Sequence, residues 1–358
     1  ERNPKVDASM VEDIILGCGN PEGAQGHNIA RNVAVLSNLP IETGGITVNR
    51  YCSSGLNSIA MAATQIQSGF SDCIIAGGVE SISTSQGHTN MHMYVNEDLA
   101  ANAPGIYHAM GTTAEAVAQR YDVSREAQDE YALSSQQRCA AAQDAGRYDD
   151  EIIPMATKMM LKNKETGAEK EVDVVVDKDD CNRPQTTLEG LSSLNPVFDP
   201  ENGSVTAGNA SQLSDGASVT LVMSEEKANE LGLKPLAYFR GFTTVGCQPD
   251  EMGIGPVFSI PKLLNSAGLT VEDIDLWELN EAFASQVVYI RDQLNIPTEK
   301  LNINGGSIAI GHPFGMTGSR QVGHLTRELR RTGGKYGIVT MCVGGGMGAT
   351  GLFEAIPE

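Results

Sequence analysis

The chain has 358 residues and a mass of 38.0 kDa, so it can bury a full hydrophobic core without disulfides or metal ions. Its 25 basic and 45 acidic residues give a net charge of −20, which would repel nucleic acid phosphates and anionic membrane surfaces, so we expect no nucleic acid partner. No stretch of about 18 apolar residues predicts a membrane span. The 39 glycines and low aromatic content are typical of an α/β enzyme, and the seven cysteines form no CxxC pair, which favours reduced thiols in a cytoplasmic protein.

An internal repeat runs through the chain. The segment VEDIIL at residues 11–16 returns as VEDIDL at residues 271–276, an offset of 260 positions (271 − 11). Cys52 and His312 each follow the start of their copy by 41 positions (52 − 11 and 312 − 271). Each stands where a β-rich run meets the small residues of a helix start. The pattern predicts a duplicated βαβ unit in which these two residues occupy equivalent strand-to-helix junctions.

The repeat divides the chain into four expected parts. They are the first half (1–83), an inserted loop domain without a counterpart in the second copy (84–204), a return to the first half (205–232) and the second half (233–358). Within the insertion we expect helices between residues 112 and 145 and a charged hairpin at 158–178.

The two halves differ at their beginnings. The second half starts with an expected strand near 236–242 and a helix near 259–267, whereas only ten residues precede Val11. We therefore expect that the chain lacks an N-terminal strand and most of a helix. Any targeting peptide would also lie in that part.

Cys52 is a candidate nucleophile because it stands at the start of a helix. The helix dipole and the nearby N–H groups are expected to lower the pKa of its thiol toward neutrality, which would make thiolate available. The alternative is an inert buried cysteine, which is the usual fate of a cysteine. The position of Cys52 in the repeat favours the catalytic interpretation.

Three further segments carry candidate chemistry. His312 stands in a turn rich in glycine and proline, which brings an imidazole close to a ligand, although a satisfied core histidine is the alternative. Cys342 is followed by glycines that suit an anion-binding backbone nest. Asn280 and Glu281 end an apolar run, where an ordinary helix cap is the alternative.

Six short motifs stand together in order along the chain. They are NRYCSSG at 49–55, GGVES at 77–81, TAGNAS at 206–211, NEAF at 280–283, GHP at 311–313 and CVGGG at 342–346. With these motifs the chain resembles the thiolase superfamily, and specifically the degradative 3-ketoacyl-CoA thiolases. The resemblance implies an α/β fold in which duplicated βαβαβαββ halves form a five-layered α-β-α-β-α core that carries an inserted loop domain.

The resemblance also implies a role for each candidate residue. Cys52 is expected to attack the 3-keto carbonyl of 3-ketoacyl-CoA and become acylated, and His312 to take its proton. Cys342 is expected to protonate the departing acetyl-CoA carbanion. Asn280 would hold a water in one oxyanion site, and the N–H groups of Cys52 and Gly344 would form the other.

Coenzyme A is then a substrate, and neither a cofactor nor a metal is expected. By resemblance, Arg183 lies beside the adenine and its phosphates. Ala207 and Ser211 line the pantetheine channel, Phe283 forms its wall, and Met110 flanks the acyl pocket. The family also implies a homodimer or homotetramer, in some members together with a hydratase/dehydrogenase partner of β-oxidation.

One departure from the family pattern bears on substrate length. Biosynthetic thiolases carry His-Met-Gly over the acyl pocket, whereas this chain has Ala109 at the histidine position. The change favours longer acyl chains over acetoacetyl-CoA. A biosynthetic acetoacetyl-CoA thiolase remains the alternative, and a non-catalytic CoA- or lipid-binding module is a more remote one. A decarboxylating ketoacyl synthase is disfavoured by Cys342.

Overall fold

The first sheet comes mainly from the N-terminal part of the chain. The computed structural model describes residues 2–356. The strand order is β2-β1-β3-β6, with β1 (Asp13–Gly17), β2 (Ile46–Val48), β3 (Cys73–Ser81) and β6 (Asp215–Met223). β1 pairs in parallel with β2 and β3, and β6 pairs antiparallel with β3. The chain therefore returns to this sheet with β6, after the long segment that follows β3.

The second sheet repeats this arrangement. Its order is β7-β10-β9-β8, with β7 (Ala237–Gly246), β8 (Leu276–Leu279), β9 (Tyr336–Val343) and β10 (Met347–Ala355). β8 pairs in parallel with β9, and β10 pairs antiparallel with β9 and β7. β8, β9 and β10 thus correspond in order and direction to β1, β3 and β6. The second sheet continues beyond β10 to β7, the strand expected near residues 236–242.

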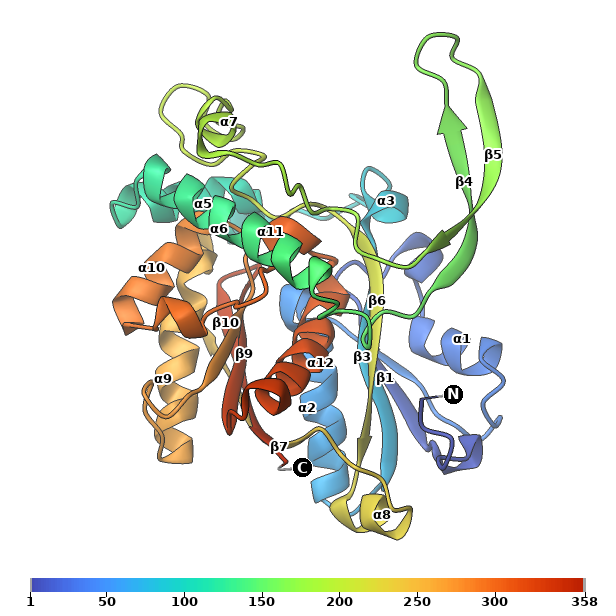
Figure 1. The fold of residues 1–358 in the computed structure, drawn as a ribbon. Coiled ribbons are helices and arrows are strands. Elements are labelled where there is room, and N and C mark those ends of the chain that lie inside the picture. Colours follow the sequence, from blue (N-terminus) through green and yellow to red (C-terminus); the bar gives the residue numbers. More distant parts are fainter. Residues whose placement is uncertain (1, 357–358) are drawn as a thin grey trace.

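Two helices, α2 (Ser54–Gln67) and α12 (Phe314–Thr332), lie between the sheets (Figure 1). Leu56 of α2 and Val322 of α12 share one buried cluster with residues from both sheets. The helices cross at glycine, because a Cβ on Gly55 would lie only 2.7 Å from the carbonyl oxygen of Gly315. This close approach brings the first turns of the two helices together.

Other helices cover the outer faces of the sheets. α9 (Gly255–Ala267) and α10 (Ala284–Leu294) lie beside the second sheet, and α1 (Ile29–Leu36) packs on β1 and β2 (Figure 1). α9 matches the helix expected near residues 259–267. Between residues 2 and 356, no helix combines the length and the apolar character needed to cross a membrane.

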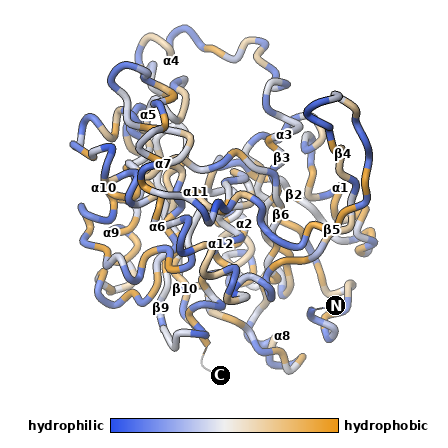
Figure 2. Tube along the Cα trace, turned by 45° about the horizontal axis from the view of Figure 1, so that its top comes forward, coloured by the Kyte–Doolittle hydropathy of each residue, from blue (hydrophilic) through white to orange (hydrophobic). Residues whose placement is uncertain are grey.

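The remaining elements belong largely to the segment between β3 and β6. They are α3 (Ile82–Ser85), α4 (Glu97–Asn102), α5 (Met110–Arg120), α6 (Arg125–Asp144), β4 (Met155–Lys162), β5 (Glu169–Val176) and α7 (Leu188–Ser192), with α8 (Glu225–Glu230) and α11 (Ser307–Ile310) further along. The expected helices within 112–145 and the expected hairpin are present as α5, α6 and β4–β5. α6 packs against α10 and α11. The hairpin projects on the side opposite α9 and α10 (Figure 1, Figure 2).

Candidate active site

Cys52 lies in the short 3₁₀ turn η3 (Tyr51–Ser53) that leads into α2, and only 9% of the residue is exposed. The backbone N–H groups of Gly344 and of Cys52 itself both face its sulfur. Gly344 follows β9 directly, in the turn that joins β9 to β10 of the second sheet. The contact shows that the first helix junction and the glycine turn of the other half meet at one sulfur atom.

The protonation of Cys52 differs from the expectation for a helix start. Burial raises the pKa of its thiol to about 12, although the N–H groups of Gly344 and Cys52 oppose that rise. The expectation of a pKa near neutrality is therefore wrong. Removing the thiolate from water destabilises it by more than the helix start and the N–H groups stabilise it. Cys52 is therefore a neutral thiol at rest, and it would need a base in order to act as a nucleophile.

His312 stands two residues before α12, as Cys52 stands two before α2. Its Nδ1 lies 2.6 Å from Thr317 Oγ1, and this hydroxyl donates its own proton to the carbonyl oxygen of Pro313 over 2.9 Å. The hydroxyl is thus an acceptor toward Nδ1, so Nδ1 carries the ring proton and Nε2 keeps a lone pair. Burial lowers the pKa of His312 to about 3, and the charge of Arg320 lowers it further. The imidazole is neutral and able to accept a proton.

Asn280 is oriented toward His312 by a second hydroxyl. Ser307 Oγ donates to Asn280 Oδ1 over 2.6 Å, and this leaves Asn280 Nδ2 directed at His312 Nε2 at 3.3 Å. The alternative of a helix cap is wrong, because α10 begins at Ala284 and its N-cap is Phe283. Asn280 is fully buried, and its side-chain amide contacts His312 instead of capping α10.

Cys342 lies one residue before the end of β9 and is fully buried. Its thiol donates to Gln286 Oε1 over 3.0 Å. Burial raises the pKa of Cys342 well above its usual range, and the neighbouring Cys52 raises it further. The turn that follows bends through Gly345 and Gly346, whose φ angles of 82° and 85° favour glycine. Two neutral thiols therefore lie beside this turn, close enough for charge on Cys52 to raise the pKa of Cys342.

An apolar wall stands over the same glycine turn. A Cβ on Gly344 would lie 3.5 Å from Met110 Sδ and 3.7 Å from Tyr51 Cδ2, and one on Gly345 would lie 3.5 Å from Ile106 Cδ1. Met110 opens α5 and shares an apolar cluster with Phe283 and Cys342. The arrangement fits a place for an aliphatic chain next to the two thiols.

The TAGNAS segment runs along the other side of the site. Ser211 N–H donates to Ala282 O over 2.9 Å, and His312 N–H donates to Gln212 O over 2.9 Å. Ser211 is half-buried, whereas Ala207 is exposed. The segment therefore reaches the surface at Ala207 and continues into the residue that contacts the backbone of His312.

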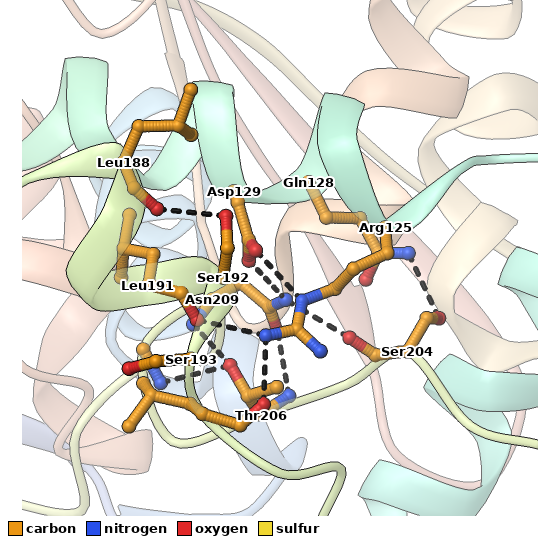
Figure 3. A network of polar contacts seen from close by, with 12 residues as sticks. Arg125, Gln128, Asp129, Leu188, Leu191, Ser192, Ser193, Ser204, Thr206 and Asn209 are labelled. Carbon is orange, nitrogen blue, oxygen red and sulfur yellow. Dashed lines mark hydrogen bonds and ion pairs between the residues drawn. The ribbon is translucent and has the colours of Figure 1, made fainter.

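The TAGNAS segment is held in place by α6 (Figure 3). Asn209 Nδ2 donates to Asp129 Oδ1 over 2.9 Å, and Arg125 pairs with the same carboxylate at 2.7 Å. Gln128 Nε2 donates to Ser204 Oγ over 2.9 Å. The inserted region thus fixes one wall of the site.

Arg183 lies apart from the catalytic side chains. Its side chain is exposed, and within the described residues no hydrogen bond or ion pair joins its guanidinium to another group. Its backbone N–H donates to Gln136 Oε1 over 2.8 Å, which fixes the loop on α6.

Two buried carboxylates hold the segments around His312: Glu80, which was not among the sequence candidates, and Glu281, which was noted there beside Asn280. Glu80 accepts hydrogen bonds from the N–H groups of Gly19 (2.7 Å) and Gly315 (2.8 Å), and Glu281 accepts from Ile308 N–H over 3.1 Å. Ile308 precedes the histidine and Gly315 follows it. Both carboxylates stand inside motifs, GGVES and NEAF, but their partners are distant in sequence, so only the fold reveals them.

The fold and the site can be compared with known proteins. Family models described as thiolase, N-terminal domain and thiolase, C-terminal domain match residues 1–226 and 233–355. The 3-ketoacyl-CoA thiolase of Bacillus subtilis (strain 168) is 49% identical over 346 residues, which cover 96% of this chain and 87% of the relative.

Solved structures agree with these matches. The dimeric peroxisomal thiolase of Saccharomyces cerevisiae is 38% identical with a TM-score of 0.87, and the alignment covers 98% of this chain and 86% of that one. The acetyl-CoA acetyltransferase of Bacillus anthracis is 39% identical with a TM-score of 0.87, covering 98% and 89%. Because the two family models together match residues 1–226 and 233–355, the chain belongs to the thiolase family.

Proposed function

We propose that this chain is a 3-ketoacyl-CoA thiolase that uses CoA to cleave 3-ketoacyl-CoA into acetyl-CoA and a shortened acyl-CoA. The observation that carries the proposal is the meeting of Cys52 and Cys342 at the glycine turn, with a neutral base, His312, at the partner helix junction. The name of the relative from Bacillus subtilis supports the same reaction. Neither CoA nor a metal is a resident cofactor in this proposal.

In the first half-reaction, Cys52 Sγ attacks C3 of the substrate and its proton passes to His312 Nε2. The N–H groups of Cys52 and Gly344 face the attacking sulfur and are suited to bind the oxyanion that forms there. The C2–C3 bond then breaks, and the acetyl-CoA carbanion takes the proton of Cys342. Asn280, directed at His312, would hold a water that stabilises the thioester oxygen of this carbanion.

In the second half-reaction, the thiol of CoA attacks the acyl group on Cys52. The proton of CoA passes to the Cys342 thiolate, and the histidinium returns its proton to the Cys52 sulfur as the shortened acyl-CoA leaves. Cys52, His312 and Cys342 then all regain their resting neutral forms. The proton that His312 takes from Cys52 is thus returned to Cys52, and the proton that Cys342 gives to acetyl-CoA is replaced by the proton of the CoA thiol.

The binding of CoA is assigned to the segments that lead to this site. Ser211, Ala207 and Phe283 are proposed to line the pantetheine channel, because the TAGNAS segment runs beside residues 282–283 toward His312. Arg183 is proposed to meet the phosphates, and its exposed guanidinium supports this role. Met110 is proposed to contact the acyl chain.

The finer architecture and assembly are also part of the proposal. Helices outside and between two equivalent sheets support five α-β-α-β-α layers formed by halves at 1–83 with 205–232 and at 233–358, with the insertion at 84–204. The dimeric relative from Saccharomyces cerevisiae supports a homodimer. We propose a cytoplasmic location.

The test combines turnover with mapping of the intermediate. The protein is mixed with a 3-ketoacyl-CoA and CoA, and release of acetyl-CoA is measured; without CoA, the protein is digested and the acylated residue is found by mass spectrometry. We expect CoA-dependent cleavage and acylation at Cys52, both lost in Cys52→Ala. Acylation of another cysteine, or binding without cleavage, would contradict the proposal.

A further inference from the structure

Gln286 contacts Cys342 directly but has no role in the mechanism above. It lies in the first turn of α10, six residues after Asn280, and is fully buried. Its Oε1 accepts the S–H of Cys342 over 3.0 Å, and its Nε2 lies 3.5 Å from the carbonyl oxygen of Asn280. One amide therefore touches the second thiol and the backbone of the oxyanion residue.

The surroundings leave Gln286 little freedom. A Cβ on Gly253 would lie 3.1 Å from Gln286 Cβ, so the turn η5 (Pro249–Ile254) approaches the glutamine closely at this glycine. Buried side chains in such packing keep one rotamer. The amide is thus held between α10, η5 and β9, with its oxygen on the Cys342 sulfur.

The geometry points to Gln286 as the positioning residue for Cys342, which holds the sulfur where it exchanges a proton with C2 of acetyl-CoA. This inference rests on the proposed function. The Cys342 thiol donates its proton to Gln286 Oε1 at rest and to the carbanion during thiolysis; in condensation the thiolate removes that proton from C2, which leaves the carbanion. The sulfur stays in place while the S–H bond turns between two acceptors.

The titratable groups around Cys342 determine the direction in which a change at Gln286 should shift the pH dependence of proton exchange. Burial is the main cause that raises the pKa of the Cys342 thiol, and a negative charge on Cys52 or Cys247 raises it further, whereas the hydrogen bond with Gln286 lowers it. A carboxylate in place of the Gln286 amide would add a further negative charge beside the sulfur and would disfavour the thiolate more strongly.

The experiment measures exchange of the methyl protons of acetyl-CoA with deuterated solvent, because this step uses Cys342, and measures acylation of Cys52 separately. We expect Gln286→Leu to lower proton exchange about 10²-fold, since a small misplacement of a reacting group has this effect. Acylation should change little. Gln286→Glu should shift the pH dependence of exchange to higher pH, which a purely structural role would not do.

Gln293→Leu is the matched control, because Gln293 lies on the same helix and is exposed. It should exchange protons as the parent protein does. Parent-like exchange in Gln286→Leu, or an equal loss of exchange and acylation, would overturn the inference. If the parent protein itself showed no cleavage of 3-ketoacyl-CoA, the proposed function would fail instead, so the two failures are distinguishable.

Discussion

Cys52 and His312 face their reaction as neutral groups because both are buried. A thiol with a pKa of about 12 and an imidazole with a pKa of about 3 do not form an ion pair at neutral pH. In the proposed reaction, the charged pair arises only when the substrate carbonyl accepts the sulfur. Catalysis would then be a coupled transfer, in which bond formation drives the movement of the proton.

This state predicts how the free protein reacts with iodoacetamide. Because the pKa of Cys52 is raised, its thiolate fraction increases with pH throughout the neutral range, so the alkylation rate at Cys52 should still be rising at about pH 10. Peptide mapping of the alkylated protein gives the rate for this residue. A plateau near pH 7 would show a preformed thiolate and contradict the expectation.

The tautomer of His312 gives a second prediction. Thr317→Val removes the acceptor for Nδ1–H, so the proton can move to Nε2 and block the base. We expect acylation of Cys52 to slow about 10²-fold, the lower limit for loss of a proton-transfer catalyst. Thr317→Ser keeps the hydroxyl and should restore most of the rate. Equal rates in the two variants would show that the hydroxyl does not set the tautomer.

At the scale of elements, the start of α12 is held by a carboxylate from the other half. Glu80 of β3 accepts N–H groups from Gly19 and Gly315, so one side chain ties the loop after β1 to the helix that follows His312. Gln25 Nε2 donates to the same carboxylate over 2.6 Å. Acceptor oxygens are needed here because the neighbours are donors.

Glu80→Gln should therefore loosen the histidine junction. The new amide group would face N–H donors, and a buried unpaired donor costs about 1–3 kcal/mol. We expect a lower melting temperature and a fall in kcat of at least about tenfold, with the KM for CoA little changed. Glu299→Gln, at an exposed glutamate, is the control. A KM effect without a kcat effect would place Glu80 in substrate binding instead.

The start of α5 bears on the length of the substrate. Met110 lies against the glycine turn, and Ala109 just before it lacks the bulk of the histidine found in biosynthetic thiolases. Each methylene buried in this place would contribute about 0.8 kcal/mol, or roughly fourfold in kcat/KM. We expect kcat/KM to rise beyond four carbons and Ala109→His to reduce that rise. A maximum at acetoacetyl-CoA would favour the biosynthetic alternative, the reaction named for the relative from Bacillus anthracis.

Local patterns and the repeat predict much of this molecule. The equal spacing of Cys52 and His312 within their copies predicts two equivalent junctions, and the structure places both two residues before a central helix. The pKa of Cys52 could not be predicted, because its burial depends on the packing of one half on the other. Glu80 and Gln286 were missed for the same reason: their partners lie far away in the sequence, and the signal is the contact itself.

At the scale of the whole molecule, a buried carboxylate makes stability depend on pH. Glu278 of β8 is buried, and its Oε2 has no hydrogen-bond partner within residues 2–356. Burial raises the pKa of Glu278 from 4.5 to about 7, although the charges of His324 and Arg320 oppose that rise. Because the pKa of Glu278 is higher in the folded than in the unfolded protein, the free energy of unfolding falls as the pH rises from 4.5 to about 7. Above this range the loss is complete and amounts to roughly 3 kcal/mol.

Glu278→Gln removes the ionisation and keeps the shape. We expect the melting temperature of this variant, relative to the parent, to be higher at about pH 8 than at about pH 5. Glu42→Gln, at an exposed glutamate, should show no such difference. Thermal unfolding at the two pH values measures it, and a pH-independent difference would show that the pKa of Glu278 does not change on folding.

The matching junctions before α2 and α12 have a consequence for how such a site can arise. β1 and α2 correspond to β8 and α12 in the other half, and Cys52 and His312 each stand two residues before their helix, so the two residues are counterparts in the two halves. In a symmetric pair of identical half-length chains both positions would carry the same side chain, two thiols or two imidazoles. A nucleophile opposite a base requires the halves to differ, and covalent linkage of the two in one polypeptide makes that difference heritable.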